Sequence, residues 1–341
     1  MTDATPTVVP SARHRTNGAG AHLRSALPLL ILLIIAAVFP FFGGKYYVDL
    51  LMKIMILSIF ALSLELLVGQ TGLVSFGHAA FFGIAAYAAA LLTPQSGAAS
   101  LWILFPASIL AAGLYALPVG ALSLRTRGIY FIMVTLAFAQ MAYYVFHDTD
   151  FGGGSDGIYM YFRPQIAIGD LSLISLDDSR VFYFFVLAAL VLTFLLLAAL
   201  QRSRFGRALA GIRINEQRMR AAGFATYPYK LAAFVTAAML AGVAGFLYAL
   251  KDGYVNPEIL SWHQSGAVLL MIILGGIGSL RGAVFGAIAF VMLQEFYQSQ
   301  AIFGALATHW QLPLGLTIIA FVALMPKGLI GLAAQLRWRR S

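Results

Sequence analysis

The sequence predicts an all-α membrane protein with about ten transmembrane helices and broken, glycine-rich segments. Two observations lead to this prediction. Of the 341 residues, 61% are hydrophobic and only 10% are charged, whereas soluble domains have about 45–50% apolar and about 25% charged residues. The apolar residues also occur in long runs, and a membrane-spanning helix needs about 20 mostly apolar residues in succession.

The apolar runs give the positions of the expected spans. They lie near residues 26–42, 47–68, 78–93, 100–123, 129–147, 180–201, 230–250, 263–275, 283–301 and 311–326. The run at 263–275 is short, so it predicts either a half-helix or a tilted span. Residues 69–77 and 275–282 are rich in glycine and interrupt apolar sequence. Irregular backbone at membrane depth is tolerated only where protein or a water-filled cavity surrounds it.

The N-terminal region contains three arginines before the first apolar run, as a signal peptide also would. The run ends in Phe-Pro-Phe-Phe-Gly at residues 39–43 and no small-x-small cleavage motif follows, so a retained first helix is favoured. Residues 1–25 are rich in Ala, Thr, Ser and Gly, and we expect them to form a disordered cytoplasmic tail. Residues 26–332 then form the transmembrane domain.

The distribution of charge predicts the orientation. If the N-terminus is inside and the spans alternate, the inside segments hold 17 of the 22 Lys and Arg residues. The long outside loop at 148–179, called the acidic loop below, carries six Asp residues. This pattern follows the positive-inside rule and places both termini in the cytoplasm, including the basic C-terminal stretch 333–341. The net charge of +9 therefore indicates topology rather than nucleic-acid binding.

Several kinds of chemistry are excluded or disfavoured. The chain has no cysteine, and it contains no G-x-x-x-x-G-K-[ST], H-E-x-x-H or G-x-S-x-G motif. Ionisable residues inside the spans are few. Lys53 and Glu65 lie near span ends and can snorkel, whereas Glu295 lies mid-span and must face protein or water. The energy must therefore come from a partner or from an ion gradient, and the missing string of carboxylates that proton-driven carriers usually have counts against the gradient.

The inside segment at 202–229, called the basic loop below, predicts one amphipathic helix from about Gly206 to Ala222. Its apolar side contains Leu209, Ile212 and Met219. Its polar side contains Arg207, Arg213, Gln217, Arg218 and Arg220. Glu216 and Arg220 form an i,i+4 pair, and Gly223 is a C-cap candidate. Such a helix either lies in the lipid headgroups or docks in a groove of a partner protein.

The stretch from Gly69 to Tyr87 combines glycines and alanine pairs with the polar residues Gln70, Ser75 and His78. One interpretation is a broken segment that lines a path for a polar substrate. Gly275, Gly276 and Gly278 of the second glycine-rich segment would line the same path. The alternative is close helix packing in which the hydroxyl and imidazole groups are satisfied locally.

Six stretches in the same order resemble one known family. They include VGQTGLVSFGHAAFFGIAAYAAALL at 68–92, FGGGSDGI at 151–158, ILGGIGSLRGAVFGAIAF at 273–290 and MPKGLIGL at 325–332, together with 127–141 and 203–250. Across about residues 46–332 the sequence resembles the LivM-type permeases of branched-chain amino-acid ABC importers. The resemblance implies the ABC importer permease fold, in a multi-pass protein of the bacterial inner membrane.

The resemblance also implies partners and a function. A periplasmic binding protein would deliver leucine, isoleucine or valine to this permease and a homologous LivH-type second permease, surrounded by membrane lipid. Two ABC ATPase subunits would bind ATP and Mg, so this chain would carry no cofactor and would not be an enzyme. The basic loop would be the coupling segment that contacts the ATPase, through Arg207, Leu209, Ile212, Arg213, Glu216, Met219, Arg220 and Gly223.

The substrate and the class of transporter stay open at this point. Similar permeases serve urea, short amides, and aromatic or dicarboxylic acids. An ion-coupled secondary transporter is a second class, which the missing string of carboxylates disfavours. A membrane scaffold or sensor is a third class, which the broken glycine-rich segments disfavour.

Overall fold

The computed structural model describes residues 31–94, 97, 99–168, 171–325 and 328–331. In this part of the chain an apolar helix occupies the position of each predicted run. Seven are long and apolar enough to cross a membrane: α2 with its continuation η2 (Lys45–Thr71), α4 (Leu101–Ser123), α5 (Ile129–His147), α6 (Ser179–Arg202), α9 (Thr226–Asp252), α11 (Leu280–Gln298) and α13 (from Gln311). Three are shorter: Ile31–Phe41, α3 (His78–Leu92) and α10 (Trp262–Gly275). The prediction of an all-α membrane protein is confirmed. The predicted tail at 1–25 and the stretch 333–341 lie outside the described residues.

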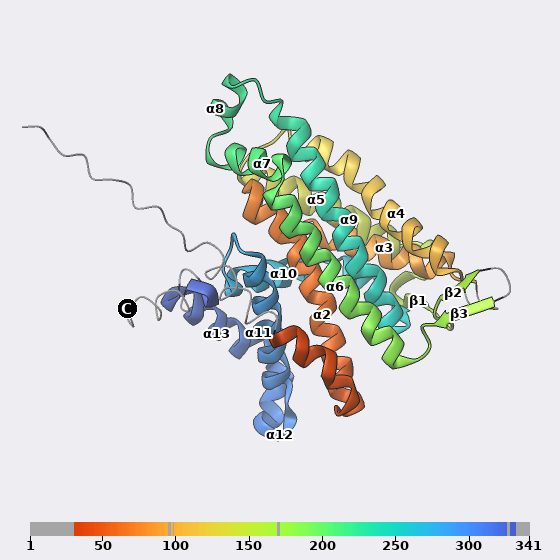
Figure 1. Ribbon diagram of the computed structural model, residues 1–341. Helices are drawn as coiled ribbons and strands as arrows, with labels where there is room; N and C mark the ends of the chain where they lie inside the picture. Colours follow the sequence, from red (N-terminus) through yellow and green to blue (C-terminus); the bar gives the residue numbers. More distant parts are fainter. Residues whose placement is uncertain (1–30, 95–96, 98, 169–170, 326–327, 332–341) are drawn as a thin grey trace, which may run out of the picture.

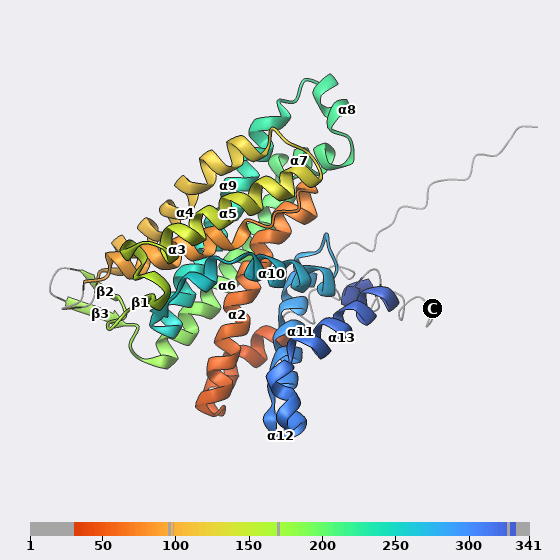
Figure 2. The ribbon, with the colours of Figure 1, turned by 180° about the vertical axis from the view of Figure 1, so that it is seen from behind.

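Helix α2 crosses the middle of the molecule, between α6 and α9 on one side and α10 and α11 on the other (Figure 1). From behind, α3, α4 and α5 are seen in front of α9 (Figure 2). In the apolar 18-residue stretch that defines each span, 83% of the residues are buried in α2 with η2, but only 28% in α5. A helix that is apolar all round belongs in a protein interior, and an exposed apolar helix belongs in lipid. Helix α2 is therefore the central element, and α5 lies at the periphery.

Glycines let the central helices approach closely, as is common between membrane helices. A Cβ atom at Gly245 of α9 would collide with the backbone oxygen of Phe82 in α3, so these two helices are in backbone contact there. In the α10–α11 hairpin a Cβ at Gly286 would collide with the backbone oxygen of Met271. Each of these contacts requires the smallest residue.

The two long loops lie at opposite ends of α6 and α9 (Figure 1). The acidic loop contains two 3-10 turns (Asp150–Gly152 and Gly154–Asp156) and three strands, β1 (Ile158–Tyr159), β2 (Gln165–Ile168) and β3 (Leu171–Ser175). Strand β1 pairs antiparallel with β4 (Tyr254–Val255), and β2 with β3. The basic loop contains α7 (Arg204–Ile214) and α8 (Glu216–Ala221). Opposite placement is what alternating spans require.

Shorter elements complete the described chain. Helix η5 (Pro257–Leu260) precedes α10, and α12 (Gln300–Phe303) and η6 (Gly304–His309) connect α11 to α13 (Gln311–Leu324). The 14-residue length of α10 agrees with the prediction of a half-helix or tilted span at 263–275.

Candidate functional site

The basic loop folds as two helices, so the prediction of one helix over 206–222 is wrong. Helix α7 begins at the N-cap Ser203, whose Oγ accepts a hydrogen bond from the amide of Gly206 at 3.2 Å. It ends before Asn215, which is extended (φ −156°) and caps α8 by accepting from the amide of Arg218 at 2.9 Å. An Asn side chain competes for backbone groups and favours a cap over a helix interior, and this breaks the helix.

The apolar side of α7 faces the chain itself. Leu209 and Ile212 are buried, and α7 packs on α6, α9 and η2. Met219 is half-buried and lies against Gly211, where a Cβ would be 2.8 Å from its sulfur. Leu209 and Ile212 thus contact the membrane domain. Their predicted role as exposed anchors for a partner or for lipid headgroups is corrected.

The exposed apolar residues of the basic loop are different ones. Ile214 is 83% exposed at the end of α7, and Phe224 and Tyr227 are also exposed. Arg207 and Arg220 are also exposed, and Gly223 follows α8 with a positive φ of 86°, as a helix-ending glycine does. Sequence reasoning missed Ile214 because on a single continuous helix it falls away from the apolar side.

A carboxylate holds α8 against the start of α9. Glu216 accepts hydrogen bonds from Arg220 at 2.6 Å, from Thr226 at 2.9 Å and from Lys230 at 2.9 Å. Partial burial alone raises the pKa of Glu216, but the hydrogen bonds from Lys230, Thr226 and Arg220 together outweigh it and lower the pKa to about 2. The predicted i,i+4 pair with Arg220 is confirmed, whereas the contacts to Thr226 and Lys230 could not be foreseen.

The first glycine-rich segment begins in a wide π-type turn, η2 (Leu66–Thr71), and leaves it at Gly72 with a φ of 74°. Ser75 and His78 are buried after it. The Oγ of Ser63 lies 2.8 Å from Nε2 of His78, and the Oγ of Ser265 accepts from the amide of Ala79 at 2.9 Å. These contacts join α2, α3 and α10 around the break.

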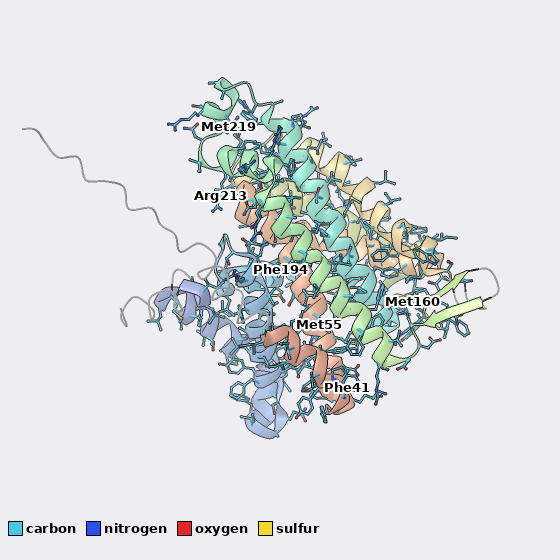
Figure 3. The ribbon with its side chains drawn as sticks, viewed as in Figure 1. Phe41, Met55, Met160, Phe194, Arg213 and Met219 are labelled. Atoms are coloured by element: carbon cyan, nitrogen blue, oxygen red, sulfur yellow. The ribbon has the colours of Figure 1, made fainter. Side chains whose placement is uncertain are left out.

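The residues predicted to line a path have mixed environments. Ser75, His78, Gly275 and Gly276 are buried, Gln70 is half-buried and Gly278 is exposed. Two cavities in the described part of the chain are lined by other residues. One is a polar recess of about 300 Å³ that includes Arg163 and Lys251 at the end with the acidic loop. The other is an apolar groove of about 490 Å³ between α2 and α6, where Met55 and Phe194 lie (Figure 3). The lining role of the glycine-rich segments stays a prediction.

The structure brings the two glycine-rich segments together at Glu65. This side chain is fully buried, and its Oε1 accepts a hydrogen bond from the amide of Gly278 at 2.7 Å. Arg213, at the end of α7 (Figure 3), donates to the carbonyl oxygen of Gly69. Sequence reasoning treated Glu65 as a snorkelling residue. The i,i+4 spacing of Glu65 and Gly69 was the available signal, because it places the carboxylate over a residue without a side chain.

Glu295 lies in the last turn of α11, which ends at Gln298, and not in the middle of the span as predicted. Its side chain faces protein, as expected. Its carboxylate accepts a hydrogen bond from the Tyr46 hydroxyl at 2.7 Å and lies 3.8 Å from Nζ of Lys53. The sequence did not pair Lys53 with Glu295. Among the described residues no group of three His, Asp or Glu side chains is arranged to hold a metal ion.

Comparisons with known proteins agree with this architecture. The profile of the family described as "Branched-chain amino acid transport system / permease component" matches residues 46–323. The "High-affinity branched-chain amino acid transport system permease protein LivM" of Escherichia coli K12 is 30% identical over 330 residues, covering 91% of this chain and 76% of that protein. The protein of the same description from Salmonella typhimurium LT2 is 29% identical with the same coverage. No solved structure matches the chain closely enough to count as a relative.

Proposed function

Because the chain belongs to the permease-component family of branched-chain amino acid transport systems, we propose that it is the membrane subunit of an ATP-driven importer for leucine, isoleucine and valine. The observation that carries the proposal is the family match over residues 46–323, which includes both glycine-rich segments and the basic loop. The relatives are described as permeases of high-affinity branched-chain amino acid systems, and the substrate class is taken from that description.

The similarity to importer permeases supports a division of labour among subunits. The chain contains no loop of the kind that cradles ATP phosphates, and two partner ATPase subunits would bind ATP with Mg. A periplasmic binding protein would deliver the amino acid, and a homologous second permease would complete the path. The protein would span a bacterial inner membrane, with both termini in the cytoplasm.

The docking surface for the ATPase is proposed to be the exposed part of the basic loop. Ile214, the most exposed of its apolar residues, is the proposed anchor, and Phe224 and Tyr227 are also exposed. A buried anchor of this size contributes about 1.5–3 kcal/mol, and exposed arginines such as Arg207 and Arg220 would steer an acidic partner surface. Leu209, Ile212 and Glu216 would support this surface from behind.

Uptake in proteoliposomes tests the proposed function. The chain is reconstituted with the second permease, the ATPases and the binding protein, and labelled leucine is added outside. We expect accumulation that requires ATP in the lumen, and competition by unlabelled isoleucine and valine but not by urea or a dicarboxylic acid. If urea or a dicarboxylic acid competed and isoleucine and valine did not, a different substrate would be assigned. Uptake driven by an ion gradient without ATP would contradict the proposal.

A further inference from the structure

Three segments that are distant in sequence meet at the end of the bundle that carries the basic loop. They are the last turns of α2 with η2, the turn between α10 and α11, and the end of α7. Two side chains join them. Glu65 comes from α2 and binds the turn at Gly278, and Arg213 comes from α7 and binds η2 at Gly69.

The glycines of the junction lie close to these two side chains. A Cβ atom at Gly69 would collide with the Glu65 carboxylate, so the carboxylate lies directly over that glycine. A Cβ at Gly72 would be 3.4 Å from Cγ of Arg213, and a Cβ at Gly278 would be 3.9 Å from its Nη1. The Arg213 side chain therefore passes close to both glycine-rich segments.

The segments differ in how readily they can move. Leu209 and Ile212 of α7 are buried, and Arg213 lies in the last turn of this helix, just before the break at Asn215. The turn after α10 contains Gly276 and Gly278, both with positive φ, and η2 is a π-type turn. Glycine allows large φ and ψ changes at little cost, and π-type turns often occur at functional sites. A displacement of α7 would therefore act on two segments, η2 and the turn after α10, whose backbone can change conformation at little cost.

We infer that Arg213 and Glu65 form a mechanical link that transmits displacement of the basic loop to both glycine-rich segments. This inference rests on the proposed function, because the displacement would come from the partner ATPase. The guanidinium carries the motion of α7 to Gly69, and the buried carboxylate carries it from α2 to Gly278. Arg213 is a positioning residue in this account, although the sequence pattern had placed it in contact with the ATPase.

The ratio of transport to ATP hydrolysis tests the link. In the complete complex, Arg213→Gln should leave the amount of bound ATPase and its hydrolysis rate near wild type. Uptake per ATP hydrolysed should fall about tenfold, which is a typical size for coupling between two sites. Glu65→Leu, which cannot accept the hydrogen bond from the Gly278 amide, should lower the same ratio. Arg204→Gln is the matched control, since Arg204 is exposed on the same helix, and it should keep the wild-type ratio.

A second measurement does not depend on the substrate. Ile277 is 48% exposed in the turn after α10, and the chain has no native cysteine, so Ile277→Cys reports the state of that turn. Its rate of maleimide labelling should differ between ATP-bound and nucleotide-free complexes. Adding Arg213→Gln should remove the difference, and adding Arg204→Gln should not.

The outcomes separate failure of the link from failure of the proposed function. Absent ATP-dependent uptake by the wild type would contradict the function, and the labelling comparison would then decide the link alone. The link would be overturned if Arg213→Gln kept the wild-type uptake per ATP hydrolysed and if labelling of Ile277→Cys in that variant still depended on nucleotide. If Arg213→Gln fails to assemble, Arg213→Met decides, because it keeps an unbranched side chain and removes the donor to the Gly69 carbonyl oxygen. A lowered ratio in that variant supports the link, and an unchanged ratio overturns it.

Discussion

Glu216 shows how a single residue can organise the basic loop. Its carboxylate is bound by Arg220, Thr226 and Lys230, and the Lys230 side chain is only 10% exposed. Removing the negative charge would leave a buried ammonium without its partner, and hydrogen bonds to charged groups contribute about 1.5–3 kcal/mol. The residue therefore contributes to the stability of the α8–α9 connection as well as to its geometry.

The substitution Glu216→Gln should lower the thermal midpoint of the purified protein by an amount equivalent to about 1–3 kcal/mol near neutral pH. The control Gln217→Ala, at an exposed neighbour, should change it little. The pKa of Glu216 is lowered from 4.5 to about 2 in the folded protein, so the folded state binds this proton more weakly than the unfolded chain. The stabilisation is present above about pH 4.5 and is lost as pH falls toward 2.

Thermal melts of both proteins across this pH range check the sign. The difference between wild type and Glu216→Gln should close as pH falls from about 5 to about 2. A difference that stays constant, or that widens on acidification, would show that the carboxylate is not held in its charged form by these partners.

At the scale of the helices, the α3–α9 contact depends on one glycine. Gly245→Ala should destabilise the protein by about 1–3 kcal/mol, because the added methyl collides with the Phe82 backbone. Gly315 of α13 has open space around it and is the matched control. Gly315→Ala should be neutral, or stabilising by up to about 1 kcal/mol, since alanine is the better helix former. Equal effects of the two substitutions in thermal melts would argue against backbone contact at Gly245.

The two apolar faces of α7 give a second prediction at this scale. Ile214→Asp should reduce co-purification of the ATPase while leaving the thermal midpoint unchanged, because Ile214 is exposed. Ile212→Asp should lower the thermal midpoint, because it places a charge in a buried position. If Ile212→Asp released the ATPase from an equally stable permease, α7 would face the partner and not the membrane domain.

The helices were predictable because apolar runs bounded by charge and glycine report membrane spans directly. One prediction failed for a local reason. Asn215 breaks the amphipathic helix through a side-chain cap, and helical periodicity does not register such a break. The junction of Glu65, Arg213 and Gly278 joins residues as much as 213 positions apart, so a local pattern cannot reveal the whole of it. The i,i+4 spacing of Glu65 and Gly69 pointed only to the part formed by α2 and η2.

At the scale of the whole molecule, the account depends on which end of the bundle faces ATP. The acidic and basic loops lie at opposite ends of α6 and α9. The positive-inside rule assigns the basic end to the cytoplasm. Docking of the ATPase on Ile214 and transmission through Arg213 both require that assignment.

Cysteine labelling measures this orientation directly. Ser155→Cys in the acidic loop and Gln217→Cys in the basic loop are both at exposed positions, and no native cysteine competes with them. In intact cells with a permeable outer envelope, a membrane-impermeant maleimide should label the cysteine at position 155. It should reach the cysteine at position 217 only after the membrane is opened. Labelling of position 217 from outside, with position 155 protected, would contradict the account.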